Sequence, residues 1–261
     1  MKIDDFSEKL KKRMTITDYN ILLHFFSFKN YIKNDILTND GIKLIKKILK
    51  SKRPLSQITG RRFFFENWFI VNKKVLIPRF ETEVIIENFI EENLNNKIIF
   101  DICCGTGCLG ISAFLKNKNS NLYLSDISKS AIRCTKKNLK EFKINASVLR
   151  GNFFQPFIKK NLKADFVIIN PPYILKGDVN VEKNVNKYEP KIALYAKQEG
   201  LEFFYKIKKD YKKILKPNGK IYCEFGFKQK EKLEQIFINE NIEYYKDYSG
   251  NWRWFVLSNL T

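Results

Sequence analysis

The sequence predicts an α/β fold: a Rossmann-like, mainly parallel, doubly wound sheet with an antiparallel last strand, preceded by a small N-terminal helical domain. From residue 84 onward, strand-like apolar runs alternate with helical stretches, a pattern typical of a parallel sheet that binds ligands at the carboxyl ends of its strands. The last two apolar segments, 242–248 and 252–257, are expected to close the sheet as an antiparallel pair. Residues 5–52 carry helical periodicity instead.

The N-terminal segment is expected to hold at least two helices. The run "DYNILLHFFSFKNYI" follows Thr17 and Asp18, which are predicted to cap it. The run "NDGIKLIKKILKSK" places four apolar residues on one helical face, namely Ile42, Ile45, Ile48 and Leu49. A bundle this short holds little chemistry of its own.

The aromatic segment "RFFFENWFIV", residues 62–71, predicts a hairpin around Glu66 and Asn67. We therefore divide the chain into a helical domain (1–55), a hairpin and linker (56–83) and an α/β domain (84–261). The α/β domain is expected to run in this order: "KIIFDI", a helix from about Cys108, "NLYLSD", a helix over 129–141, "ASVLR", "DFVIIN", a helix over 201–215 and "KIYCEF".

Composition narrows the class of protein. A chain of 261 residues with 44% hydrophobic content can bury one large core and a smaller one. The start "MKIDDFSEKLKKRM" lacks the apolar stretch of a signal peptide, and no later window approaches ~18 uninterrupted apolar residues. We expect a soluble, cytoplasmic, monomeric protein without a membrane partner.

The cysteines predict reduced thiols. Their spacing is not that of a disulfide framework, and no second pair follows Cys103 and Cys108 at zinc-ribbon spacing. The single histidine, His24, lies far away in the sequence. We therefore expect no metal site.

The net charge of +20 has two interpretations. Lysines near phosphates strengthen association with nucleic acid, which would suit proximity to RNA or the ribosome. Against this, 40 of the 48 basic residues are Lys and only 8 are Arg, they are spread through every segment, and Asn is also abundant. Compositional bias is the favoured explanation.

The strand "KIIFDI" runs directly into "CCGTGCLG", so Asp101, Gly105, Thr106 and Gly107 lie on the first strand-to-helix turn. The two glycines would let the backbone approach a ligand without a Cβ in the way. A lone GxG is weak evidence for a ligand site, because a tight turn without a ligand also needs glycine.

Asp126, which ends "LYLSD" 21 residues after Gly105, strengthens the case for a nucleoside ligand. A carboxylate at the end of the second strand can accept hydrogen bonds from ribose hydroxyls. The turn lacks the third glycine of the dinucleotide fingerprint and the lysine of a P-loop, which disfavours pyrophosphate and triphosphate ligands. S-adenosylmethionine, which has a ribose but no phosphate, agrees better with these features of the turn.

The fourth strand ends in Asn170, Pro171, Pro172 and Tyr173, beside the first strand at the expected switch point of the sheet. Two prolines stop strand pairing and make this turn rigid. The Asn170 side-chain oxygen and the Pro171 carbonyl can both accept hydrogen bonds from a planar NH2 group and aim its lone pair at a methyl group. Tyr173 would supply a wall for the planar group, and no strong general base is needed.

With these motifs the sequence resembles the bacterial HemK/PrmC-type release factor glutamine methyltransferases over nearly its whole length. "RPLSQITGRRFF" and "VLIPRFETE" match the segment between the family's domains, "DICCGTGCLGI" its cofactor loop and "INPPY" its catalytic tetrapeptide. "YEP", "EFGFKQ" and "DYSGNWR" match further segments. NPPY alone also occurs in methyltransferases that act on DNA adenine and RNA guanine.

The resemblance implies a class I methyltransferase sheet and roles for individual residues. The cofactor would be surrounded by Asp101, Cys103, Cys104, Gly105, Thr106, Gly107, Asp126, Phe153 and Asn170. Phe153 would flank the adenine, and residues 170–173 would bind the target glutamine. Cys103 stands where many members have glycine, and Phe80 replaces the usual proline of "IPRPETE".

Arg79 and Glu81, with Glu83, form a second tier of candidate residues that could border the substrate cleft. An ordinary helix start with ion-paired acids explains Glu81 and Glu83 at least as well. Residues 1–55 resemble the family's domain for docking release factors, although here that domain is short.

The predicted function is transfer of a methyl group from S-adenosylmethionine to the glutamine amide in the Gly-Gly-Gln motif of class I release factors, leaving S-adenosylhomocysteine. One rival is methylation of a nucleic-acid base, which NPPY and the charge would allow, but no appended nucleic-acid-reading module is visible. Another is a degenerate binding protein without catalysis, which the intact Asp126, Asn170 and Tyr173 disfavour.

Overall fold

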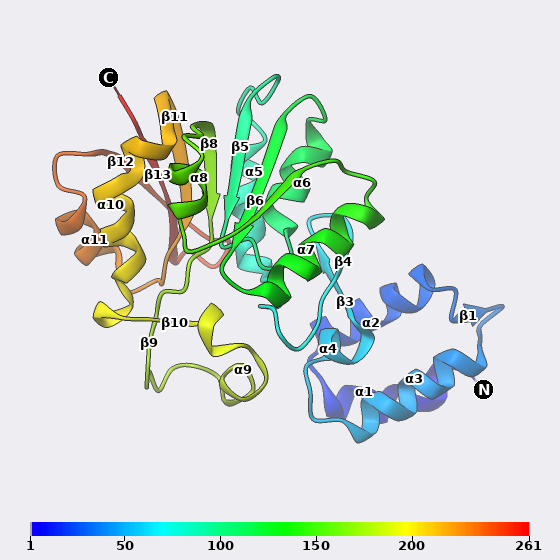
Figure 1. Cartoon of the computed structure of the whole chain (residues 1–261). Coiled ribbons are helices and arrows are strands. Elements are labelled where there is room, and N and C mark those ends of the chain that lie inside the picture. The colour runs from blue at the N-terminus through cyan, green and yellow to red at the C-terminus, as the bar shows by residue number, and fades with distance from the viewer. Residues whose placement is uncertain (1, 261) are drawn as a thin grey trace.

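The computed structural model describes residues 2–260, and the chain begins with a helical domain (Figure 1). Its elements are α1 (Asp4–Arg13), α2 (Ile16–Phe28), the short strands β1 (Ile32–Lys33) and β2 (Ile36–Leu37), α3 (Asn39–Lys50) and α4 (Leu55–Thr59). Leu10, Phe26 and Ile45 bring α1, α2 and α3 into one apolar core. The predicted face of α3 is confirmed, since Ile45 and Ile48 are buried in that core.

The cap of α2 lies two residues earlier than predicted. Thr15 has an extended backbone, and its Oγ1 accepts a hydrogen bond from the Asp18 nitrogen at 3.1 Å, so the helix begins at Ile16. Asp18 lies in the first turn, where a negative charge is favourable beside the helix N-terminus. The prediction of Thr17 and Asp18 was wrong because two threonines compete here and only the backbone angles decide between them.

The predicted hairpin is confirmed as β3 (Arg61–Phe64) paired with β4 (Asn67–Ile70). Phe65 and Glu66 form its turn, both with positive φ, as in the type I′ turns that are common in two-residue hairpins. Trp68 packs into the core of the helical domain. The domain limits at 55 and 83 stay a prediction.

A seven-stranded sheet forms the rest of the fold, in the order β12-β13-β11-β8-β5-β6-β7 (Figure 1). Its strands are β5 (Ile98–Ile102), β6 (Asn121–Asp126), β7 (Ser147–Arg150), β8 (Ala164–Ile169), β11 (Leu215–Glu224), β12 (Asn241–Lys246) and β13 (Trp252–Ser258). β13 is antiparallel to both β11 and β12, whereas the pairs among β5, β6, β7, β8 and β11 are parallel. The predicted closing pair and antiparallel last strand are confirmed.

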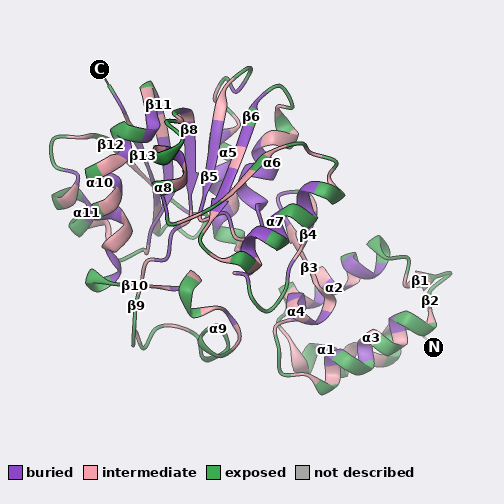
Figure 2. Cartoon of the chain, in the orientation of Figure 1, coloured by how far each residue is buried: buried purple, intermediate pink, exposed green. Residues whose placement is uncertain are grey.

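Helices cover both faces of this sheet. One face carries α5 (Glu83–Phe89), α6 (Cys108–Lys116) and α7 (Lys129–Glu141), and the other carries α8 (Gln155–Lys159), α10 (Glu202–Ile214) and α11 (Lys230–Ile236). Successive strand residues serve the two faces in turn, as Ile99 and Phe100 do in β5. Figure 2 shows the central strands almost entirely buried, which explains their continuous apolar runs.

The chain between β8 and α10 forms no part of the main sheet. It contains β9 (Ile174–Leu175), α9 (Lys183–Tyr188) and β10 (Tyr195–Ala196), with the 3-10 turns η2 (Lys191–Ala193) and η3 (Gln198–Gly200). A further 3-10 turn, η1 (Phe80–Thr82), precedes α5. In Figure 1 the segment from β9 to β10 projects below the sheet, beside the helical domain.

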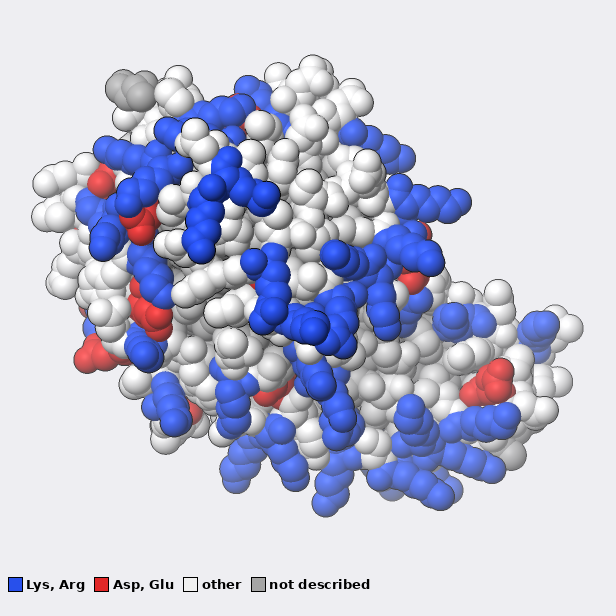
Figure 3. All heavy atoms as spheres, viewed as in Figure 1, with Lys and Arg blue, Asp and Glu red and all other residues white. Residues whose placement is uncertain are grey.

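On the face drawn in Figure 3, basic side chains are spread over the helical domain and over the rest of the chain, as the sequence predicted. Between residues 2 and 260, no helix is long and apolar enough to cross a membrane.

Candidate active site

The carboxyl ends of β5, β6 and β8 lie side by side. In the parallel register, Asp101 of β5 lies opposite Leu124 of β6 and Ile168 of β8. The segments that follow these strands therefore meet at one edge of the sheet. β8 follows β7 in the chain but pairs with β5, so this edge is the switch point of the sheet.

The turn after β5 has the backbone that the sequence predicted. Cys103, Gly105 and Gly107 all have positive φ, and Gly107 begins α6 in the left-handed conformation. A Cβ on Gly107 would lie only 3.0 Å from Thr135 and 3.1 Å from Ile111, so this position requires glycine. A Cβ on Gly105 would meet nothing within 4 Å, because open space lies above it.

Two side chains of α7 hold this turn in place. Thr135 Oγ1 donates to the Gly105 carbonyl at 3.1 Å, and Asn138 Nδ2 donates to the Thr106 carbonyl at 2.8 Å. Asn138 also bonds both backbone groups of Ile70 in β4, accepting from its nitrogen at 2.7 Å and donating to its oxygen at 3.1 Å. Asn138 thus joins the hairpin to the turn, a role that its sequence context does not signal.

Asp126 is oriented by backbone donors. Its Oδ2 accepts from the Gly105 nitrogen at 3.0 Å, and its Oδ1 accepts from the Ser128 nitrogen at 2.8 Å. Burial raises the pKa of this carboxyl, and the backbone N–H groups partly oppose that shift. Each carboxylate oxygen retains a lone pair for a further donor.

A cavity of ≈ 270 Å³ opens at this edge of the sheet. Six predicted residues line it: Cys103, Gly105, Asp126, Phe153, Asn170 and Pro172. Asp101, Cys104, Thr106 and Gly107 instead lie buried beneath the turn. Pro171 and Tyr173 are not among the residues that line this cavity.

The cavity's chemistry agrees with S-adenosylmethionine. Asp126 offers acceptors for ribose hydroxyls, and the open space above Gly105 lets a ligand approach the backbone. Phe153, stacked on Phe154 at 4.1 Å and edge-on to Phe203 at 5.1 Å, offers an aromatic wall for a planar base. Burial raises the pKa of the Cys103 thiol well above its usual range, so this cysteine is a neutral wall residue.

Asp101 is buried under the turn with one oxygen paired. Its Oδ2 accepts from the Gly110 nitrogen at 2.9 Å, while its Oδ1 has no hydrogen-bond partner among the described residues. Burial, with Asp126 nearby, raises its pKa to about 7. Within residues 2–260 the five cysteines are free, and no three His, Cys, Asp or Glu side chains cluster as a metal site would need.

Asn170 belongs to a hydrogen-bonded group centred on Glu224, the last residue of β11. Glu224 is buried and accepts from Asn170 Nδ2 at 3.0 Å, from the Tyr173 hydroxyl at 2.8 Å and from Thr82 Oγ1 at 2.5 Å. Glu224 was not predicted from the sequence, although it begins the segment "EFGFKQ". Its position at the carboxyl end of a predicted strand was the available signal.

The second-tier candidates, Arg79, Glu81 and Glu83, have different surroundings in the structure. Arg79 pairs with the buried Glu189 at 2.6 Å, and Glu189 also accepts from the Ile77 nitrogen at 3.1 Å. In the described part of the chain, neither Glu81 nor Glu83 forms an ion pair with a basic side chain, and Glu81 is exposed.

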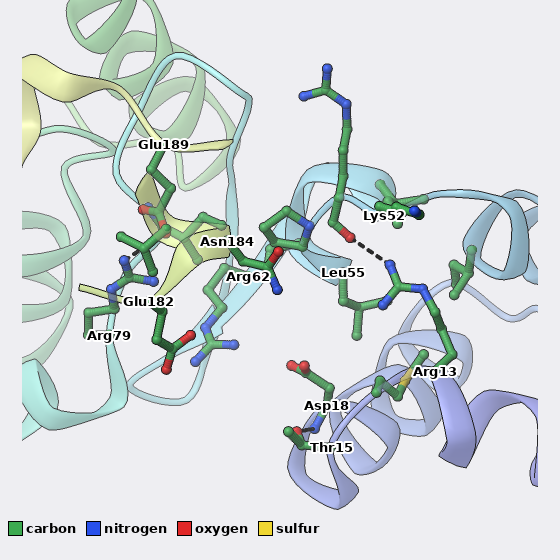
Figure 4. A pocket seen from close by; sticks show the side chains of 18 residues that line it. Arg13, Thr15, Asp18, Lys52, Leu55, Arg62, Arg79, Glu182, Asn184 and Glu189 are labelled. Atoms are coloured by element: carbon green, nitrogen blue, oxygen red, sulfur yellow. Dashed lines mark hydrogen bonds and ion pairs between the residues drawn. The ribbon is translucent and has the colours of Figure 1, made fainter. Parts of the chain in front are cut away.

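Arg79 and Glu189 line a second cavity of ≈ 310 Å³ between the helical domain and residues 182–189 (Figure 4). Figure 4 shows the Arg62 guanidinium directed into the space between Glu182 on one wall and Asp18 on the other. Arg62 Nε donates to the Pro78 carbonyl at 3.1 Å. Over residues 2–260 its two Nη atoms have no acceptor, and it forms no ion pair.

Comparisons with known sequences find methyltransferases. Residues 80–187 match the family described as "Methyltransferase small domain". The release factor glutamine methyltransferase of Mycoplasma mycoides subsp. mycoides SC is 42% identical over 261 residues, covering 93% of this chain and 92% of that protein. Its namesake from Clostridium acetobutylicum is 36% identical, covering 77% and 73%. A bifunctional methyltransferase of Rickettsia conorii is 37% identical over 81% of this chain, which spans 46% of that relative.

Solved structures share the fold at low identity. A methyltransferase from Pyrococcus furiosus has a TM-score of 0.56 at 16% identity, covering 74% of this chain and 89% of that one. A ribosomal protein L11 methylase from Lactobacillus delbrueckii subsp. bulgaricus has a TM-score of 0.53 at 15% identity, covering 70% and 81%. The predicted class I methyltransferase sheet is confirmed by these folds and by the strand order.

Proposed function

The chain belongs to the family of release factor glutamine methyltransferases, and we propose that it performs their reaction with the side chains at the carboxyl ends of β5, β6 and β8. The reaction moves a methyl group from S-adenosylmethionine to the glutamine amide nitrogen in the Gly-Gly-Gln motif of class I release factors, leaving S-adenosylhomocysteine. The observation that supports these residues is the position of Asn170, which lines the cavity while its amide is tied to Glu224.

The cofactor is held, in this proposal, by the turn after β5 and the end of β6. Asp126 accepts hydrogen bonds from the ribose, and Phe153 packs against the adenine. The bound cofactor supplies a methyl group on a positively charged sulfur, which is an electrophile. Asp101, Cys104, Thr106 and Gly107 act indirectly, because they shape the turn from beneath.

Asn170 and Pro171 position the target amide. The Asn170 Oδ1 and the Pro171 carbonyl accept hydrogen bonds from the NH2 group, which orients the nitrogen lone pair toward the methyl group. Pro172 lines the cavity, and Tyr173 is fixed by its hydroxyl bond to Glu224. With the cofactor bound, the new N–C bond would form as the S–C bond breaks, and the nitrogen would lose one proton to water.

We propose that the release factor docks across the second cavity, between residues 1–55 and residues 182–189. Glu189 lines this cavity and Pro190 lines the cofactor cavity, so the two share one wall. In the described part of the chain, the Nη–H groups of Arg62 have no acceptor there, and a half-buried guanidinium is well suited to binding the carbonyl or carboxylate oxygens of a protein partner. Arg79 supports the shared wall through Glu189. Glu81, which is exposed, remains a candidate for contact with the substrate.

We further propose that the enzyme works as a cytoplasmic monomer. The excess of lysine would favour proximity to ribosomal RNA at low salt. Sedimentation of the purified protein, alone and with ribosomes over a range of salt concentrations, tests the monomeric state and the association with ribosomes. A dimer would contradict the first, and an association that does not depend on salt, or none at all, would contradict the second.

The decisive experiment measures transfer of labelled methyl groups from S-adenosylmethionine to a purified class I release factor. A factor with alanine in place of the Gly-Gly-Gln glutamine and total RNA serve as parallel substrates. Label on the wild-type factor alone is expected. Label on RNA would instead support the rival function in base methylation, and cofactor binding without transfer would support a degenerate binding protein.

A further inference from the structure

We propose that Glu224 is a positioning residue that fixes the amide of Asn170, so that the oxygen rather than the nitrogen of Asn170 faces the substrate. This inference rests on the proposed use of Asn170 as an acceptor for the target NH2 group. On this view Glu224, a buried side chain outside the NPPY tetrapeptide, determines which chemical group of the substrate the site binds.

The register of the sheet places the two residues together. Cys223 of β11 pairs with Ile169 of β8, so the next residues along each strand, Glu224 and Asn170, lie side by side at the carboxyl edge. The Glu224 side chain is fixed from three directions, by η1 through Thr82, by the strand end through Asn170 and by the following loop through Tyr173. It therefore cannot turn away from Asn170 without losing other bonds.

A carboxylate decides the orientation because it only accepts hydrogen bonds. The asparagine group that faces Glu224 must be the Nδ2 donor, and Oδ1 is left to face the other way. Turning the amide over would place Oδ1 against the carboxylate and leave a buried acceptor pair without a donor. It would also present Nδ2 to the substrate, where it would oppose the target NH2 group.

The consequence is selectivity for a group that donates hydrogen bonds. A glutamine amide can turn its NH2 group toward Asn170 Oδ1, whereas a glutamate carboxylate at the same place would bring two acceptors together. Glu224 thereby helps the enzyme to distinguish glutamine from glutamate in the target motif.

A competing role for Glu224 is that of a general base or charge stabiliser. Its contacts argue against this, because three protein donors already occupy its oxygens and its bond to Asn170 lies on the side of Nδ2, away from Oδ1. The two roles predict different effects of Glu224→Gln and Glu224→Leu. In Glu224→Gln, the side-chain oxygen can still accept from Asn170 and Thr82, and the side-chain NH2 can donate to the Tyr173 oxygen. The side chain in Glu224→Leu can do neither.

The test compares kcat and KM of these two variants on a release factor. Glu224→Leu is expected to lower kcat at least 10-fold, in line with the loss of one positioned hydrogen-bonding group. Glu224→Gln is expected to lose only about threefold in kcat, because it keeps the orientation. Cofactor affinity, measured by calorimetry, should change less than about threefold in both. Equal losses in both variants would indicate a charge or base role and overturn the proposal, as would full activity in Glu224→Leu.

A double variant separates orientation from packing. Asn170→Asp would place a second carboxylate against Glu224, and we expect at least a 100-fold loss of kcat. Adding Glu224→Gln supplies an NH2 donor to the new aspartate and should restore kcat at least 10-fold. Simple addition of the two losses would contradict the proposal.

Glu92, in the turn after α5, offers a control whose carboxylate also accepts from a tyrosine hydroxyl. It accepts from the Tyr222 hydroxyl at 2.6 Å and from Lys220 Nζ, both of β11, so Glu92→Leu removes a half-buried carboxylate bonded to a tyrosine away from the proposed site. This variant should lower thermal stability but leave kcat unchanged. If the wild-type enzyme methylates no release factor at all, the proposed function fails, whereas the outcomes above test Glu224 alone.

Discussion

The backbone nitrogen of Gly105 lies 3.0 Å from the Asp126 carboxylate, so the turn after β5 and the end of β6 form one unit at the cofactor cavity. This contact orients the Asp126 carboxylate, and the side of the carboxylate that faces the cavity is free to bind a ligand. Thr135 and Asn138 of α7 hold the same turn from below. Cofactor affinity should therefore depend on a few contacts between segments far apart in the sequence.

Asp126→Ala should weaken S-adenosylmethionine binding about 30-fold, because it removes two hydrogen bonds to a charged acceptor. Isothermal titration calorimetry measures this. Asp165→Ala is the control, since Asp165 also accepts from a backbone N–H, that of Ile98 at 2.9 Å, but at the opposite end of β5. An unchanged dissociation constant in Asp126→Ala would refute its ribose role.

Asn170→Ala should lower methyl transfer at least 100-fold while cofactor affinity stays within about threefold, because the substrate amide loses its side-chain acceptor. Single-turnover assays with labelled cofactor measure the chemical step. Normal turnover in this variant would exclude the proposed mechanism.

Asn138→Ala should lower the free energy of unfolding by about 3 kcal/mol, because it leaves the partly buried Ile70 nitrogen and the buried Thr106 carbonyl without their side-chain partner. Urea denaturation measures the change. The exposed Asn88, whose Nδ2 donates to the Val84 carbonyl of its own helix, is the control, and Asn88→Ala should cost less than about 0.5 kcal/mol. Equal effects of the two variants would show that the Asn138 contacts contribute nothing beyond an ordinary surface bond.

Asp101 should make the protein less stable as the pH rises from about 4 to about 7. Burial raises its folded pKa to about 7, so the unfolded chain releases a proton in this window while the folded chain keeps it. Between pH 5 and pH 7 this costs about 2 kcal/mol, which Asp101→Asn should remove. Urea unfolding of both proteins at the two pH values measures the difference, and parallel pH profiles would exclude a raised pKa at Asp101.

Arg62→Gln should raise KM for a release factor at least 10-fold without changing cofactor affinity, because the cavity beside the helical domain would lose a positive charge whose Nη atoms have no acceptor among the described residues. Steady-state kinetics with the intact factor measure KM. Arg133→Gln, an exposed charge on α7, controls for the loss of one positive charge. Equal shifts in both variants would mean that net charge alone governs docking.

The elements that the sequence predicted well are those with strong local patterns. The strands ending in Ile102, Asp126 and Ile169 are largely apolar runs. The turn after Ile102 carries glycines, which allow a positive φ, and the turn after Ile169 carries two prolines, which restrict the backbone. The cap of α2 was misplaced because Thr15 and Thr17 have the same side chain, and only the backbone angles of Thr15 distinguish them.

By itself, therefore, the sequence predicted the order of the main-sheet strands and of the helices α6, α7 and α10, together with the glycine turn, Asp126 and the NPPY turn, because each is written in neighbouring residues. Only the tertiary structure decided that Glu224 meets Asn170 and Thr82, that Asn138 joins the hairpin to the turn, and that Glu189 neutralises Arg79. These partners are 32 to 142 residues apart along the chain. Their contacts depend on strand register and on the packing of α7 and of residues 182–189, which no local pattern encodes.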